Sequence, residues 1–319
     1  MIISDKQELK RCVKQAVRRV QIAECCLDFD MQNGPLGVDA LMDEAGVHPG
    51  KGTPFGENGA AFYAALDALE LPARDLSSAR SIQQSYERHA YIREVLDSMR
   101  AKRVLVTVDC RAQSVDFYGE DRISPMIAAD ESFFEAGRYG VDYAQLAKRL
   151  EDMLAAMNSK DLMIRRFDEH ALRYCAFPVC EDMHAVLHVL LRDEGEIGRF
   201  CALLESFPSV RAVVHAASGL DGRLIAAAAE QPRLLPVLSS MDHLEEALAA
   251  LGTRFIPFTC RALSPDMMLG RWIVAKDAFW QALCDAYLPL ARSGYPLESG
   301  TIEKDIQALL GGNLLSLYE

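Results

Sequence analysis

The 319-residue sequence lacks any hydrophobic run that approaches the ~18 apolar residues needed to cross a membrane. It also lacks the features of a secretory leader, because Met1–Ile3 is followed at once by the polar run SDKQE and by no long apolar core. We therefore expect a cytoplasmic protein that does not associate with a membrane.

Disulfide and redox signatures are missing as well. The nine cysteines are odd in number and form no CxxC pair. In a chain with no leader, such cysteines are expected to be reduced thiols, most of them buried as small apolar groups.

Positive charge is in short supply, because 34 lysines and arginines face 46 aspartates and glutamates and give a net charge of -12. Such a protein gains little from counterion release, so a general nucleic-acid binder is not expected. The densest basic stretch, KRCVKQAVRRV, has its charges at helical spacing. We interpret it as a solvated helix face.

Several common site motifs are absent. The sequence contains no GxGxxG and no GxxxxGK[ST], so no nucleotide cofactor is expected. It contains no GxSxG, the motif of a serine-hydrolase elbow. His184 and His188 are four residues apart and would share a face of a helix or of a strand, but the HExxH glutamate is missing. A metal role for this pair is therefore not favoured.

The apolar residues that are present predict alternating strands and helices from about residue 100 onward. RVLVTVDC is the clearest strand, and six to eight strand candidates can be counted in all, including a poorly defined one near 124–130. Short apolar strands alternating with helices indicate a parallel sheet flanked by helices.

The number of strands and the chain length favour an α/β fold of the (β/α)8 TIM-barrel type. An open doubly wound sheet is the competing architecture. No linker separates a second domain, so one barrel domain is predicted over residues 1–319, with an N-terminal helix in 1–20 and a helical C-terminal segment in 264–319.

Reactive groups of a parallel barrel belong at the carboxyl ends of its strands. The predicted strand ends supply Glu24, Cys26, Asp28, Asp109, Arg111, Arg192, Asp193, Glu194, His215, Ser218, Ser239, Ser240, Thr259, Cys260 and Arg261. Guanidinium groups at such a position suit a carboxylate or phosphate ligand, although each arginine has the alternative of a salt bridge to a loop acid.

One further histidine lies in a different setting. His48 falls in a Gly- and Pro-rich stretch that follows the first strand, and such long loops often carry function. It is a candidate for contact with a substrate, as a mobile acid or base, and the alternative is a solvated loop residue.

The stretch QIAECCLDFD near the start combines several metal-friendly side chains. Neighbours on a strand face opposite sides, so Cys25 is expected to point away from Cys26. Cys26 and Asp28 then share a face, where they are either weak zinc ligands or simply a strand end with buried thiols.

The C-terminal part of the chain resembles a known family. It reads FIPFTCRALSPDMMLGRWIVAKDAFWQAL and then YPLESGTIEKDIQALLGGNLLSLYE, which is similar to the tail of uronate-isomerase-like members of the amidohydrolase superfamily. GVDALMDEAG, RDL, VLVTVDC, LLRDEGEI and FPSV follow in the family's order, so the resemblance spans most of the chain. It implies a distorted (β/α)8 barrel.

The usual metal motif of that family is not present. The family's His-x-His at the end of strand one corresponds here to Cys26 and Asp28, and its strand-eight acid is replaced by Thr259 and Cys260 before Arg261. The resemblance therefore implies a degenerate metal site. Zinc held by a rebuilt site that includes Cys26 and Asp28 is left as a less favoured alternative.

What the resemblance implies for function is recognition of a small anionic molecule, such as a sugar acid. Arg192 and Arg261 would hold its carboxylate, and Asp28, Asp109 or His215 would move a proton in an isomerase, lyase or hydrolase reaction that does not use the usual metal. The alternative is a catalytically inactive barrel kept as a binding or scaffolding subunit. Homo-oligomerisation is left open.

Overall fold

The structure is a computed structural model that describes residues 3, 5–26, 42, 44, 57–70, 88–110, 120–129 and 142–319. The chain forms two compact units, each described here by itself. Unit 1 comprises Met1–Val106, Asp116–Ile123 and Cys260–Gly311, and unit 2 comprises Thr107–Val115, Ser124–Thr259 and Gly312–Glu319. The prediction of one domain over the whole chain stays a prediction.

Unit 1 begins with helix α1 (Lys6–Arg19), which Asp5 caps by accepting hydrogen bonds from the backbone N–H groups of Gln7 and Glu8. Its apolar face is buried, while Arg11 and Arg18 are exposed. The basic stretch is therefore a solvated helix face, as predicted.

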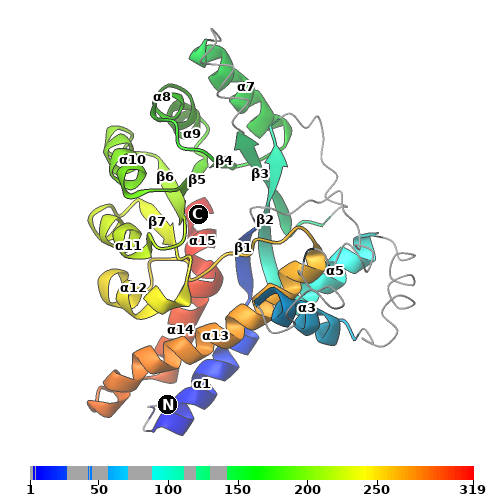
Figure 1. Cartoon of the computed structure of the whole chain (residues 1–319), viewed down its shortest axis with the longest axis vertical. Coiled ribbons are helices and arrows are strands. Elements are labelled where there is room, and N and C mark those ends of the chain that lie inside the picture. Colours follow the sequence, from blue (N-terminus) through cyan, green and yellow to red (C-terminus); the bar gives the residue numbers. More distant parts are fainter. Residues whose placement is uncertain are drawn as a thin grey trace. The chain divides into compact units, whose positions relative to one another are not determined.

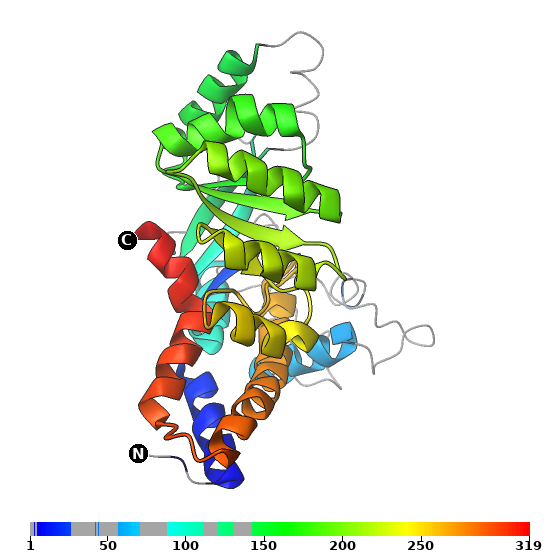
Figure 2. The same ribbon diagram turned by 90° about the vertical axis from the view of Figure 1, so that its left-hand side faces the viewer.

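Two parallel strands follow in unit 1. Strand β1 (Ile22–Cys26) is buried throughout and pairs with β2 (Ala101–Asp109), whose residues from Thr107 onward belong to unit 2. The helices of unit 1 are α3 (Glu57–Ala68), α5 (Arg88–Met99), α13 (Pro265–Arg292) and α14 (Ser299–Gln307). Helix α1 packs against α13 and α14, as Figure 2 shows.

Unit 2 is a run of parallel strands that pair in the order of the sequence. They are β3 (Ile123–Ala129), β4 (Asp161–Ile164), β5 (Val186–Leu191), β6 (Arg211–Ala216) and β7 (Leu234–Val237). Each pairs in parallel with the next. The α/β class with parallel strands is thus confirmed, and β4 is a strand that the sequence patterns did not reveal.

Helices connect these strands. They are α7 (Tyr143–Ala156), α8 (Glu169–Ala171), α9 (Phe177–Asp182), α10 (Glu194–Ser206), α11 (Asp221–Glu230) and α12 (Leu244–Leu251). The longer ones lie one after another beside the strands in Figure 1. Strand carboxyl ends therefore lead directly into helix starts, the arrangement that gathers functional groups at one edge of a parallel sheet.

The predicted eighth strand, RFIPFTC, is present only as a single parallel bridge between Val237 and Ile256. Pro257 follows the bridge and has no N–H to donate, which hinders further pairing. None of the described helices is both long enough and apolar enough to span a membrane.

Candidate active site

Three of the predicted residues occupy strand ends in unit 2. Asp109 is the last residue of β2 and is exposed, Arg192 follows the last residue of β5, and His215 lies one residue before the end of β6. The parallel pairing of β5 with β6 places the ends that carry Arg192 and His215 at one edge of the sheet. Asp28, His48 and Arg111 lie outside the described residues.

Arginines are concentrated at the ends of β4 and β5. An Nη atom of Arg192 donates to the carbonyl oxygen of Arg165, 3.5 Å away, so its side chain crosses the end of β4. Arg165 and Arg166 follow β4 directly, and all three side chains are exposed. Sequence reasoning missed Arg165 and Arg166 because it missed β4. The signal that locates them is the three-residue apolar run LMI, Leu162–Ile164, directly before the two arginines.

The first turn of α10 holds the backbone of Arg192 in place. Its backbone N–H donates to a carboxylate oxygen of Glu196 at 2.6 Å, and Asp193 caps the helix by accepting from the N–H of Glu196. Asp193, predicted as a strand-end acid, is therefore a helix cap.

His215 is buried and packs on a second histidine. Only 3% of its surface is exposed, and its ring stacks on that of His188 with centroids 6.0 Å apart and planes inclined by 25°. The strand register pairs His188 with Val213 and Leu190 with His215, so both rings lie on the same face of the sheet.

His188 belongs to a buried polar line. Its Nε2 lies 2.9 Å from Oδ1 of Asp161, and both side chains are fully buried. The hydroxyl of Tyr318, near the C-terminus, donates to the same Oδ1 atom. This arrangement was not predicted, because Asp161, His188 and Tyr318 are far apart in the sequence. His184, in contrast, is exposed in a turn before β5 with φ of 50°.

The serines at the end of β7 have structural partners. Ser239 donates both its N–H and its hydroxyl to the buried carboxylate of Asp221, at 2.8 and 2.6 Å. Ser240 accepts from the N–H of Asp242 and caps a short 3-10 turn. These contacts hold the connection from β7 to the helices beside it, so we assign these serines no chemistry.

Unit 1 contains four other predicted residues, Glu24, Cys26, Cys260 and Arg261, and Glu24 of β1 contacts the segment that holds the last two. One carboxylate oxygen of this fully buried side chain accepts the N–H of Cys260 at 2.8 Å. Burial raises the pKa of Glu24 to about 8, against smaller lowering effects from the Cys260 N–H and the Trp272 side chain. Arg261, the next residue after Cys260, is exposed.

Two thiols of unit 1 donate to backbone carbonyl oxygens. Cys26 Sγ donates to the carbonyl oxygen of Ala262 at 3.6 Å, and Cys260 Sγ to that of Met268 at 3.8 Å. Burial raises the pKa of the Cys260 thiol, which opposes the thiolate that zinc requires. Within the described ranges, no three His, Cys, Asp or Glu side chains are grouped to hold a metal ion. The donors that are described therefore do not fit the family's metal.

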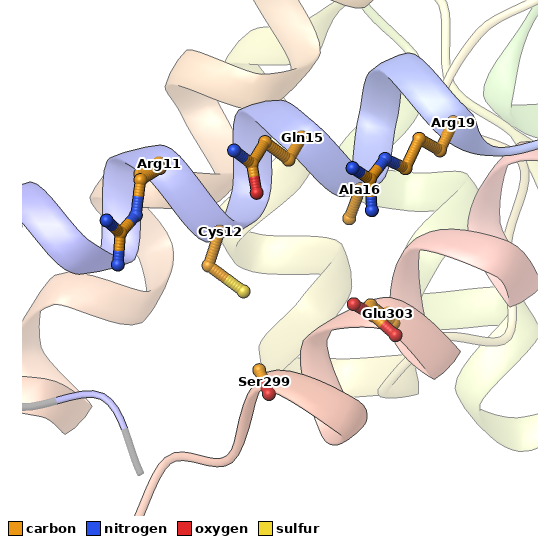
Figure 3. Close-up of a pocket in the computed structure, with 7 residues that line it drawn as sticks. All are labelled: Arg11, Cys12, Gln15, Ala16, Arg19, Ser299 and Glu303. Carbon is orange, nitrogen blue, oxygen red and sulfur yellow. The ribbon is translucent and has the colours of Figure 1, made fainter. Parts of the chain in front are cut away.

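A cavity of about 340 Å³ lies between α1 and α14 of unit 1 (Figure 3). Helix α1 contributes most of its walls, and α14 contributes Ser299 and Glu303. It is lined by helix residues alone and contains none of the predicted site residues.

Comparison with known proteins places this fold. No family profile and no curated protein matches the sequence. A uronate isomerase from Bacillus halodurans C-125 is 15% identical, with a TM-score of 0.82 over 99% of this chain and 97% of that one.

Two further solved structures are similar over nearly the whole chain. A uronate isomerase from Thermotoga maritima is 12% identical, with a TM-score of 0.63 over 100% of both chains. A protein described as a candidate metal-dependent hydrolase from Lactobacillus casei is 12% identical, with a TM-score of 0.64 over 96% of this chain and 97% of that one. The chain therefore has a uronate-isomerase-like fold.

Proposed function

We propose that this chain is a divergent uronate-isomerase-like enzyme of (β/α)8 type that isomerises a small sugar acid by acid–base chemistry. The observation that carries the proposal is the placement of Arg165, Arg166 and Arg192 at adjacent strand ends, with His215 at the end of β6. Planar guanidinium groups bind a carboxylate bidentately, which is the feature that distinguishes a uronate from a neutral sugar.

In this proposal Arg192 holds the carboxylate of the substrate beside the end of β4. Isomerisation moves protons within one molecule, so it needs a group that takes a proton and returns it. His215 has this role, because histidine changes its charge near neutral pH. Asp109, exposed at the end of β2, is the second acid–base candidate.

No step is assigned to a metal, since the described donors do not fit one. Arg261 keeps its proposed role in carboxylate binding within unit 1, and His48 and Asp28 keep theirs as sequence-based proposals. From composition we also propose a cytoplasmic protein that binds a small anion and no nucleic acid.

The test is to incubate the purified protein with D-glucuronate and D-galacturonate and to follow isomerisation by NMR, with bound metal measured in the same preparation. Arg192→Ala is expected to raise KM by about tenfold or more, the loss of one charge-assisted pair. The control is Arg211→Ala, at the opposite end of β6, which should leave KM unchanged. No turnover of any uronate by the wild-type protein would contradict the proposal.

A second candidate function is a sugar-acid-binding subunit without catalysis. It is favoured by the thiol of Cys26, which bonds to Ala262 at the position where the resemblance expects a metal-binding histidine. Calorimetric binding of a uronate that depends on Arg192, with no conversion of the bound molecule, would support this candidate against the enzyme.

A further inference from the structure

A line of buried polar side chains crosses one face of the sheet in unit 2. It consists of Asp161 on β4, His188 on β5 and His215 on β6, and the half-buried Tyr318 contacts its first member. The side chains of Asp161 and His188 are 0% exposed. Burial of a charged or polar group is unfavourable unless it is well paired, so a chain of such groups in an otherwise apolar strand layer calls for an explanation.

The strand register accounts for the shape of this line. Asp161 is paired with Val186 and Met163 with His188, so Asp161 and His188 share a face and lie two residues apart along the strands. His215 lies two residues further along, opposite Leu190. The line therefore runs from the first residue of β4 toward the carboxyl end of β6, where the proposed chemistry takes place.

The C-terminal segment reaches this face as well. Asn313 donates to the carbonyl oxygens of Thr253 and Phe255 and so fixes the start of the segment within unit 2. Five residues later, the hydroxyl of Tyr318 donates to Asp161. A group from the end of the chain thus contacts the innermost acid of the line.

The hydrogen bond to Asp161 bears on which ring nitrogen of His188 carries a proton. An ionised carboxylate accepts hydrogen bonds and does not donate, so a hydrogen bond between His188 and an ionised Asp161 requires the proton on Nε2 of His188. In the neutral ring this leaves Nδ1 as the acceptor nitrogen. Tyr318 supplies a second donor to the same oxygen and so holds the Asp161 carboxyl group to which the His188 ring is bonded.

The ring of His215 stacks on the ring of His188, and the two ring planes are inclined by 25°. We propose that Asp161 and Tyr318 are positioning residues, which orient His215 through His188 and so aim it at the substrate. The inference rests on the proposed function of His215. It goes beyond that function because it gives the C-terminal segment, through Tyr318, a role in supporting His215.

A purely structural role makes a different prediction. In that case the loss of a hydrogen bond lowers stability and leaves the orientation of His215 unaltered. A positioning role changes the ring environment of His215 and lowers kcat with little change in KM, since misplacement of a catalytic group by about 1 Å reduces rates by on the order of 100-fold.

The experiment uses the full-length protein with isotope-labelled histidine, with each signal assigned by substitution of one histidine at a time. The wild-type His188 should show the tautomer protonated at Nε2. In Tyr318→Phe, which removes one oxygen atom, the His188 and His215 ring signals should both shift, and kcat on D-glucuronate should fall by about tenfold or more. Asp161→Asn is the second variant and should shift both rings further.

The matched control is Tyr287→Phe. The hydroxyl of Tyr287 donates to the carboxylate of Asp305 in unit 1, so the same atom is removed from the same kind of bond. This variant should leave the His188 and His215 signals and kcat unchanged.

The outcomes separate the inference from the proposed function. Shifted His215 signals in a protein that turns over no uronate would sink the proposed function and support the positioning. Unshifted His215 signals in both variants, or an unchanged kcat despite shifted signals, would overturn the inference. If the variants do not fold, the wild-type spectrum decides, because a His188 protonated at Nδ1 excludes the arrangement.

Discussion

At the scale of single residues, Glu24 is a carboxylic acid held away from water. It lies in the middle of β1, fully buried, and its carboxylate holds the backbone of Cys260. Burial raises its pKa to about 8 from an ordinary value of 4.5, so the folded protein keeps this group protonated at neutral pH. The residue that tethers the 260–262 segment to β1 is thus an uncharged acid.

This pKa predicts a pH dependence of stability. Between about pH 5 and about pH 8 the folded state binds a proton that the unfolded state has released, so unfolding becomes easier by about 1.4 kcal/mol for each pH unit gained. Glu24→Gln keeps an acceptor for the Cys260 N–H and removes the titration. The difference in unfolding free energy between the variant and the wild type should therefore shift in favour of the variant by about 3 kcal/mol between pH 5.5 and pH 7.5.

Urea denaturation of both proteins at the two pH values measures this difference. The control is Glu245→Gln, the same change at an exposed carboxylate on α12. The fall of the unfolding free energy with rising pH should disappear in Glu24→Gln and persist in Glu245→Gln. An equal pH dependence of stability in Glu24→Gln and the wild type would refute the account of Glu24.

At the scale of elements, α13 packs closely against α3 in unit 1. A Cβ atom added at Gly270 of α13 would lie 1.9 Å from the carbonyl oxygen of Ala61 and 2.6 Å from its carbonyl carbon. Real Cβ atoms do not approach backbone so closely, so the two helices would have to separate. Gly270 is therefore required by packing.

Gly270→Ala should destabilise the protein by about 3 kcal/mol or more, because the backbone cannot yield as a side chain does. Gly198→Ala in α10 is the matched control, since a Cβ there meets nothing within 4 Å. The control should stabilise by about 0.5–1 kcal/mol through its higher helix propensity. Thermal unfolding measures both, and a tolerated Gly270→Ala would contradict the packing described.

The elements also show what the sequence patterns predict and what they cannot. The strand β2 was predicted from RVLVTVDC, and the alternation of strands with helices such as α7 and α10 was predicted from about residue 100 onward, since these patterns extend over many residues. Strand β4 was missed because DLMI has four residues and begins with a charged side chain. The eighth strand was expected over RFIPFTC, but only one bridge of it forms, because Pro257 interrupts the pairing.

At the scale of the whole molecule, the order of weak motifs was enough to predict the fold, as the likeness to uronate isomerases confirms. The candidate site was predicted only in part. Arg192 directly follows a clear strand and His215 lies near the end of another, so their positions could be read from the sequence. The bond from Asp161 to His188 joins residues 27 apart, and that from Tyr318 to Asp161 joins residues 157 apart. No local pattern encodes such pairs.

The central claim is that His215 performs acid–base chemistry on a uronate, and paired histidine substitutions test it most directly. His215→Asn should lower kcat for D-glucuronate by at least about 100-fold, the usual contribution of a general acid–base group. His184→Asn is the control, because this exposed residue precedes β5 and its positive φ is well suited to asparagine. The account predicts wild-type turnover for His184→Asn and loss for His215→Asn, and wild-type turnover by a folded His215→Asn would contradict it.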